Sequence, residues 1–453
     1  MTQASTEGQF KRVLSQREVL ALAFGAMVGW GWVALAGGWV LSAGAMGAML
    51  AFALGGLAML LIGLTYAELA SAMPLVGGEH VYAHRALGPG GAFVCTWAIA
   101  LAYVSVSAFE AVALPTVLEE LIPQLKQFHL WTVAGYDVYL TWALVGMLVS
   151  VVVTWINIRG VKTAALLQTL VTLALLGAGL LFLAGVSLNG KLANLIPYVS
   201  DGRAGVLVVL AVVPFMFVGF DVIPQVAEEI DLPKRDIGRL IILSVALAVL
   251  WYALICLAVG LSMPAADLAG VALAPVTGTA LAWQSPLAGN VIILAGIAGI
   301  LTSWNAFLVG GSRAIYVMAK AGQLPAFLSR LHPRYNTPVN AILLMGLLCV
   351  AAPLFGRKLL VWLVDAGSFS VVIAYGLVAL SFVVLRLREP DMARPYRVKW
   401  GLPVGLAAFV LSLALGVLYL PGGAAALIWP YEWLIVFGWS GLGLVFYVLR
   451  GRG

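Results

Sequence analysis

Long apolar stretches recur along almost the whole chain, and each is long enough to cross a lipid bilayer. A membrane span needs about 20 mostly apolar residues. The 453 residues are 63% hydrophobic and only 10% charged, whereas a soluble domain carries roughly 25% charged residues. The composition therefore excludes a soluble globular protein. Twelve membrane spans are predicted, at residues 18–40, 45–69, 91–116, 138–157, 164–186, 204–229, 238–262, 287–310, 337–355, 359–386, 402–420 and 431–449.

The basic residues predict how these spans are oriented. If both termini are cytoplasmic, only five of the 25 Lys and Arg residues fall on the outer side, namely Lys126, Lys191, Arg203, Arg357 and Lys358. Cytoplasmic connections normally hold the excess of positive charge, so we expect cytoplasmic termini. The polar start of the chain has no cleavage site of a removable signal peptide. The connections 311–336 and 386–401 look like short interfacial helices and turns.

Two of the apolar segments are interrupted at their centres, at matching places in the two halves of the chain. The interrupting residues are Gly25, Gly29 and Gly31 in the first segment, and Pro214, Gly219, Asp221 and Pro224 in the sixth. Hydrocarbon offers no partner to free backbone groups, so such breaks are costly unless those groups bind something. Paired breaks are the best pointer in a sequence to the substrate site of a transporter.

Several motifs make the chain similar to the amino acid–polyamine–organocation superfamily of secondary transporters. They are GAMVGWGW (25–32), AELASAMPLVGGEHVYAHRALGP (67–89), GFDVIPQVAEEIDLPKRDI (219–237), SRAIYVMAKAGQLP (312–325) with NTPVNA (336–341), and RPYRVKWGLP (394–403). The resemblance implies an all-α membrane domain with a 5+5 inverted repeat and broken helices 1 and 6. One repeat would span about 18–186 and the other about 204–386, with accessory helices at about 402–449. The two broken segments agree with this scheme, because each is the first of five.

The resemblance also implies a substrate site at the two breaks. The amides around Gly29, Trp30 and Gly31 would receive a carboxylate, because the start of a helix attracts anions. The carbonyls of Met27, Phe215 and Val218 match positions that hold an ammonium group. Phe215 would also cover the substrate as a gate, beside the break at Gly219. The alternative is that the glycines serve close helix packing, their usual use in membranes.

Two acidic residues deep in the membrane are candidates for substrate binding or proton coupling. Glu110 shares a helical stripe with Tyr103 and Ser107, which is expected to face the site. It would bind a cationic group, carry a proton, or serve as a structural partner. Asp221 follows the second break and would respond to protonation or hold helix 6 to its neighbours. Trp304 and Asn305 are further candidates for the pocket wall.

Two positions depart from the pattern of the superfamily. Trp30 stands where the superfamily usually has a small residue, so its indole either narrows the pocket, favouring a small amino acid or amine, or points elsewhere. Leu175 takes the place of a lysine that replaces sodium in some relatives. Glu79, His80 and His84 belong to the inner loop motif and lack a third metal ligand, so we expect no metal site. Cys95, Cys256 and Cys349 predict no disulfide framework.

The sequence thus predicts a plasma-membrane permease for amino acids or related amines, working by alternating access of helices 1, 2, 6 and 7 against 3, 4, 8 and 9. We expect no cofactor besides a coupling proton or other ion, and no nucleic-acid partner. Simple exchange is an alternative to proton coupling. A sensor of the same fold is a second reading. An intramembrane enzyme is a third, but no HExxH motif and no close pair of membrane aspartates supports it.

Overall fold

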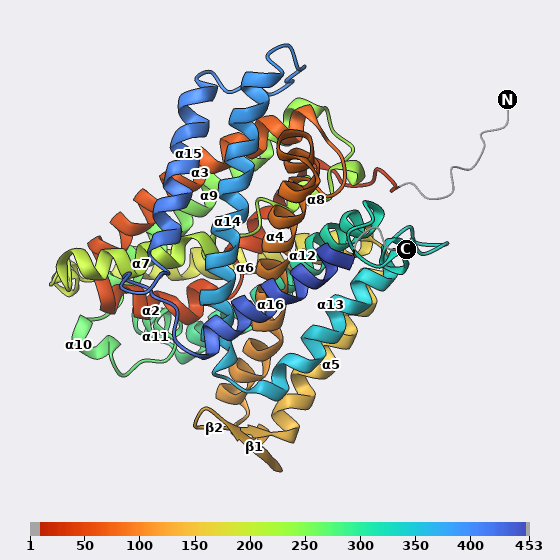
Figure 1. Ribbon diagram of the computed structural model, residues 1–453. Coiled ribbons are helices and arrows are strands. Elements are labelled where there is room, and N and C mark those ends of the chain that lie inside the picture. The colour runs from red at the N-terminus through yellow and green to blue at the C-terminus, as the bar shows by residue number, and fades with distance from the viewer. Residues whose placement is uncertain (1–9, 450–453) are drawn as a thin grey trace.

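The computed structural model describes residues 10–449, which are mostly helical (Figure 1). The helices are α1 (Gln16–Val28), α2 (Gly31–Ala43), α3 (Ala45–Ala72), α4 (Glu79–Leu121), α5 (Leu140–Ile158), α6 (Val161–Asn189), α7 (Gly202–Met216), α8 (Val222–Gln225), α9 (Lys234–Ser262), α10 (Ala265–Leu268), α11 (Ala274–Ala282), α12 (Pro286–Lys320), α13 (Val339–Ala351), α14 (Leu359–Arg388), α15 (Gly401–Val417) and α16 (Tyr431–Leu449). Short 3₁₀ turns are η1 (Pro123–Leu125), η2 (Leu192–Leu195), η3 (Ala227–Glu229), η4 (Ala326–Ser329) and η5 (Ala352–Phe355).

Each predicted span overlaps one or more helices. Within residues 10–449, eight helices are long and apolar enough to cross a membrane, or up to nine if α1 and α2 form one bent span. The predicted spans at 204–229, 337–355 and 402–420 fall on shorter apolar helices. The membrane character of the chain is therefore clear, while the count of twelve spans and the inverted repeat stay predictions.

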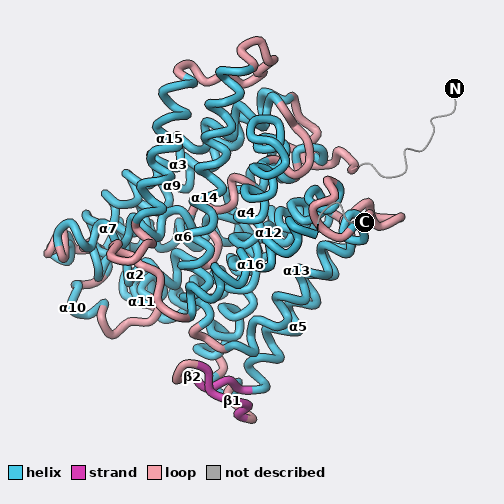
Figure 2. The backbone as a smooth tube through the Cα atoms, viewed as in Figure 1, coloured by secondary structure: helices cyan, strands magenta, loops and turns pink. Residues whose placement is uncertain are grey.

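The mostly helical structure agrees with the predicted all-α class, but the connection before α5 contains a short hairpin that was not predicted. Strands β1 (His129–Val133) and β2 (Tyr136–Tyr139) form an antiparallel hairpin there (Figure 2). Its two-residue turn has positive φ at both Ala134 and Gly135, as hairpin turns of type I′ require. The predicted span from 138 therefore started too early. The pattern was missed because the apolar residues of β2 run directly into those of α5.

The connection expected to begin at residue 311 begins instead after Lys320, because α12 continues unbroken to that residue. No Gly or Pro interrupts residues 312–320, and Ile315 and Met318 remain buried on the helix. Arg313 accounts for the polar appearance of this stretch, yet its side chain is buried and paired with Glu229. A buried charge with a partner does not end a helix, so the sequence pattern was misleading.

The core of the bundle is built around α4, which packs against α14 and α12, while α3 packs along α9. Helix α16 lies at the edge and is mostly exposed. The connection between α14 and α15 lies at the top of the view in Figure 1, and the hairpin projects at the bottom.

The predicted cytoplasmic segments gather at one end of the bundle, which we call the basic end. Arg85 pairs with Glu389, and the Gln323 amide donates to the carbonyl of Pro89. At the N-terminal side, Phe10 contacts Tyr316 edge to face. The opposite end, which carries β1 and β2, is called the hairpin end.

Candidate functional site

The first predicted break is present between α1 and α2. Helix α1 ends at Val28, α2 begins at Gly31, and the two axes differ by 41°. The N–H groups of Trp30, Gly31 and Trp32 have no hydrogen-bond acceptor among the described residues. They form the N-terminal turn of α2, where the helix dipole adds partial positive charge. This turn can therefore receive a carboxylate.

The second predicted break lies directly beside the first. Helix α7 ends at Met216, and regular helix resumes only at Val222. Gly219 has φ +140°, and a Cβ atom there would stand 2.9 Å from the backbone nitrogen of Met27. A side chain at this position would push the two breaks apart, so glycine is required. Asp221 completes the turn by accepting a hydrogen bond from the Gly219 N–H at 2.6 Å.

Tyr252 of α9 holds the two breaks together. Its hydroxyl donates to the carbonyl of Met27 at 2.5 Å and lies 3.3 Å from the carbonyl of Met216. One side chain thereby satisfies a carbonyl freed by the first break and contacts one at the second. Of the three carbonyls predicted to hold an ammonium group, Met27 accepts from Tyr252 and Phe215 accepts from the Val218 N–H. The carbonyl of Val218 has no donor among the described residues.

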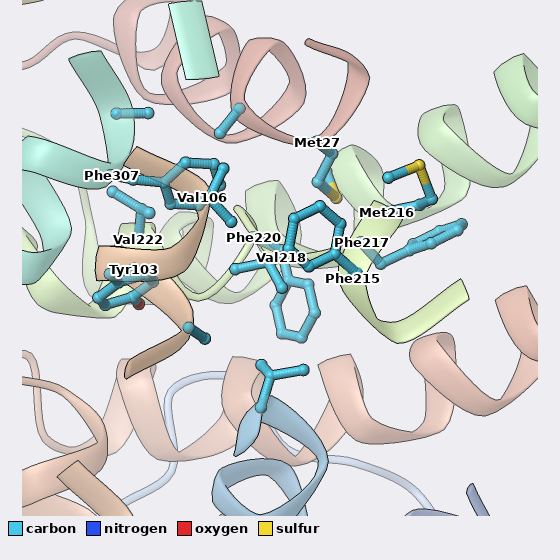
Figure 3. Close-up of a cluster of buried hydrophobic side chains, with 14 of the residues drawn as sticks. Met27, Tyr103, Val106, Phe215, Met216, Phe217, Val218, Phe220, Val222 and Phe307 are labelled. Carbon is cyan, nitrogen blue, oxygen red and sulfur yellow. The ribbon is translucent and has the colours of Figure 1, made fainter. Parts of the chain in front are cut away.

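A small cavity of about 20 Å³ lies between the breaks, with room for about one water molecule. Its lining residues are Ala26, Met27, Gly29, Trp30, Gly31, Val106, Phe109, Glu110, Phe215, Met216, Val218, Ser303 and Phe307. Figure 3 shows Met27, Val106, Phe215 and Val218 close together in a cluster of buried apolar side chains. An amino acid fits there only after some of these side chains move.

Glu110 of α4 supplies the only ionisable group among the residues that line this cavity. The Ser303 hydroxyl of α12 donates to its Oε1 atom. Its Oε2 atom is buried and has no hydrogen-bond partner among the described residues. A buried carboxyl oxygen without a donor favours either a proton or a cationic group of a ligand.

Trp30 and Phe109 separate the small cavity from a larger one, which we call the vestibule. The vestibule measures about 420 Å³ and is bounded by α2, α4, α7 and α14, with Arg357 towards the hairpin end. Both aromatic residues line both cavities. The Trp30 indole packs on Gly296, where a Cβ atom would stand 1.9 Å from the ring. These two rings form the barrier between the site and the vestibule.

The structure brings together seven of the predicted site residues around the small cavity: Met27, Gly29, Trp30, Gly31, Glu110, Phe215 and Val218. The other predicted residues are buried nearby but do not line it. Tyr103 donates to Asp221 at 3.1 Å, and the amide of Asn305 bonds to Asn157 and Gln168, towards α5 and α6. Ser107 and Trp304 have polar atoms without partners among residues 10–449. The roles of all these residues stay predictions.

Several residues at the site were missed from the sequence. Phe109 and Ser303 lie on long apolar helices, and Tyr252 lies 31 residues beyond Asp221 on another one. Nothing in an apolar run marks which face points inwards. The position of Phe109 beside Glu110 gave no signal either, because neighbouring residues on a helix point about 100° apart.

The cluster at the start of α4 does not converge on a metal. His80 bonds to Thr96 at 3.0 Å, and its ring stacks near that of His84. Among residues 10–449, no three His, Cys, Asp or Glu side chains are grouped so as to hold a metal ion.

Comparison with known proteins gives matches over nearly the whole chain. The family model described as "Amino acid permease" matches residues 14–442. The branched-chain amino acid permease BcaP of Bacillus subtilis is 29% identical, over 99% of this chain and 95% of its own length. The methylthioribose transporter of the same organism is 26% identical, over 97% and 94%. The cationic amino acid transporter 4 of Mus musculus is 27% identical over 86% of this chain, which spans 62% of that longer protein.

Proposed function

The chain belongs to the amino acid permease family, and from this premise we propose that it carries an amino acid across a membrane by alternating access. Its relatives are transporters rather than enzymes, so the intramembrane enzyme is excluded. A plasma-membrane location with cytoplasmic termini is part of the proposal, and it rests on the distribution of basic residues. Some relatives are named for the vacuole or the mitochondrion.

One observation carries the proposal: complementary groups for a zwitterion border the same small cavity. The free N–H groups of Trp30 and Gly31 suit a carboxylate. The unpaired Oε2 atom of Glu110 and the free carbonyl of Val218 suit an ammonium group. An α-amino acid presents these two charges on one carbon atom, so it satisfies both sets of groups in one position.

The remaining walls indicate the side chain of the substrate. Met27, Val106, Phe215, Met216 and Phe307 are apolar, so the site favours a small or medium apolar side chain such as that of leucine or valine. A cationic amino acid is the second candidate. It is supported by Glu110, whose free oxygen would pair with a guanidinium or a second ammonium group.

Transport would proceed by opening the two ends of the site in turn. From the hairpin end, substrate enters the vestibule and passes when Trp30 and Phe109 move apart. Release towards the basic end requires α1 and α8 to move away from the bundle. Glu110 and Asp221 are the candidates for proton coupling, because both are buried in the membrane region without a basic partner among the described residues. Exchange of one amino acid for another is the alternative.

Uptake into proteoliposomes tests the proposal. Purified protein is reconstituted, and entry of radiolabelled L-leucine is measured with an excess of unlabelled valine, methionine, arginine or ethanolamine. We expect saturable uptake that valine and methionine inhibit and ethanolamine does not. If arginine alone inhibits uptake, and the Glu110→Gln variant loses this inhibition, the substrate is a cationic amino acid rather than an apolar one. Binding of leucine without uptake would indicate a sensor and contradict the transport proposal.

A further inference from the structure

Among residues 10–449, three glutamates are buried at the basic end, and they differ in whether a basic side chain pairs with them. Glu68 of α3 contacts Arg386 and Arg394, with an N–O distance of 2.9 Å to the latter. Glu229 contacts Arg313 at 3.0 Å. Glu79, at the start of α4, is fully buried and is not within ion-pair distance of any basic residue among residues 10–449. Arginine side chains therefore balance the negative charges of Glu68 and Glu229, whereas no basic side chain among the described residues pairs with Glu79.

The groups that interact with Glu79 are an amide, phenols, a thiol and another carboxyl. The Oε2 atom of Glu79 accepts a hydrogen bond from the side-chain amide of Gln225. Its Oε1 atom has no partner among the described residues, and the hydroxyls of Tyr66 and Tyr82 nearby also lack partners of ordinary geometry. The titratable groups that interact electrostatically with Glu79 are Tyr66, Tyr82, Cys95, Tyr103, Asp221 and Tyr375, from α3, α4, the break before α8, and α14.

An ionised carboxylate in such a place is unfavourable. Burying a charge without a counter-ion costs far more than burying a hydrogen-bonded neutral group, and the group responds by taking up a proton. The nearby Asp221 adds a second acid rather than a compensating charge. A neutral carboxylic acid at Glu79, by contrast, accepts from Gln225 and keeps an O–H group to donate to a phenol oxygen.

Glu79 also lies at a joint that transport must open. Gln225 is the last residue of α8, and the loop before Glu79 is held on the same segment. The Gly77 N–H donates to the Gln225 carbonyl at 3.4 Å, and the Val76 N–H donates to Glu228 Oε1 at 3.2 Å. A Cβ atom on Gly78 would stand 2.6 Å from Pro224, so the two backbones touch. Moving α8 outwards separates Gln225 from Glu79 and admits water.

We propose that Glu79 is a proton-binding site of the basic end, which holds its proton while α8 is seated and releases it to water when α8 moves away. The proposal rests on the proposed transport function for its role in the cycle. The proton-holding state itself requires only the folded chain. Glu110 and Asp221 do not share this position, because among residues 10–449 their carboxyl groups accept hydrogen bonds from Ser303 and from Tyr103 and Gly219, respectively.

Infrared spectroscopy of the purified protein in nanodiscs at neutral pH tests the protonation directly. The spectrum of Glu79→Gln is compared with that of the wild type in the region of the protonated carboxyl stretch. We expect this signal to lose one component in Glu79→Gln. Glu389→Gln is the matched control and should leave the signal unchanged, since the hydrogen bond from Arg85 lowers the pKa of Glu389. An unaltered carboxyl signal in Glu79→Gln would overturn the proposal.

A second variant keeps the Glu79 carboxyl, so the protonation of Glu79 can be tested even if Glu79→Gln does not fold. Gln225→Met removes the amide donor while leaving Glu79 in place, so the Glu79 component should shift in frequency rather than vanish. No shift would place the signal on another acid and contradict the assignment. Neither measurement needs a transported substrate, so both stand even if leucine uptake is absent.

The role in the cycle is tested by uptake of labelled leucine at varied internal pH. A single titrating group changes a rate by at most about tenfold per pH unit. We expect wild-type uptake to depend on the internal pH within this limit, and Glu79→Gln to lose that dependence while Glu389→Gln keeps it. The same dependence in wild type and Glu79→Gln would remove Glu79 from the cycle.

Discussion

At the scale of single residues, the candidate site includes positions where the surrounding atoms leave no space for a larger side chain. Gly29 shows this most clearly, because a Cβ atom there would stand 2.8 Å from the Ser303 hydroxyl. That hydroxyl is the donor to Glu110 Oε1. Glycine at this position therefore serves both the backbone break and the carboxyl on the opposite wall of the cavity.

We expect Gly29→Ala to weaken leucine binding by about tenfold or more, because displacing Ser303 leaves a buried carboxyl oxygen without its donor, at a cost of about 1–3 kcal/mol. Scintillation proximity binding of labelled leucine measures this. Gly177→Ala is the control, since a Cβ atom there meets no atom within 4 Å. Equal affinity of the two variants would show that Gly29 is not part of the site.

Trp30 is expected to limit the size of the substrate, because its ring lines both the small cavity and the vestibule. Trp30→Leu should allow phenylalanine to compete with leucine for uptake, while Trp400→Leu, at a ring that is 70% exposed, should not. Competition assays in proteoliposomes give the comparison. An unaltered substrate range in Trp30→Leu would mean that other side chains set the limit.

At the scale of elements, the two interrupted helices are held at their breaks by a third. The Tyr252 hydroxyl of α9 contacts carbonyls of α1 and α7. These carbonyls, which lack their usual helical N–H partners, are therefore hydrogen-bonded within the membrane. The Tyr252 ring stacks on Phe52 of α3, with centroids 4.9 Å apart. The breaks are thus supported features of the fold rather than loose joints.

Tyr252→Phe should lower the free energy of unfolding by about 1 kcal/mol, the usual net worth of a buried hydrogen bond, and should also weaken leucine binding. Thermal unfolding with and without leucine reports both effects. Tyr375→Phe provides the comparison, because that buried hydroxyl has no partner among the described residues. If Tyr375→Phe were the more damaging change, Tyr252 would not be the support of the breaks.

Elements differ in how well the sequence predicts them. The breaks were predictable because Gly and Pro at 25–31 and 214–224 oppose helix within membrane segments. The hairpin at 129–139 was not, since its strands merge with apolar helix patterns. The inward positions of Phe109, Ser303 and Tyr252 were likewise beyond prediction. In helices that face lipid on one side and protein on the other, both sides are apolar, so the periodicity that marks a buried face in soluble proteins is absent.

At the scale of the whole molecule, charged side chains close the basic end. Glu68 connects α3 to both Arg386 of α14 and Arg394 in the connection to α15. Its Oε2 atom also accepts from the Val398 N–H at 2.7 Å. A carboxylate with this many donors fixes the far end of α14 against the first half of the bundle.

Glu68→Gln should therefore destabilise the protein by about 3 kcal/mol, the lower end of the range for a broken buried pair, because two partly buried arginines lose their counter-ion. The exposed pair of Arg85 and Glu389 gives the contrast, since Glu389→Gln should cost no more than about 1 kcal/mol. Denaturant or thermal unfolding in detergent distinguishes the two. Similar losses in both variants would show that the Glu68 network does not close this end.

We propose that two interrupted helices expose backbone groups that bind an amino acid. The most direct measurement is an experimental structure of the protein with L-leucine bound. We expect the substrate carboxylate to lie within hydrogen-bond distance of the N–H groups of Trp30, Gly31 and Trp32. We expect the substrate ammonium group to face Glu110 and the Val218 carbonyl. Leucine bound elsewhere, with those N–H groups paired within an unbroken helix, would contradict it.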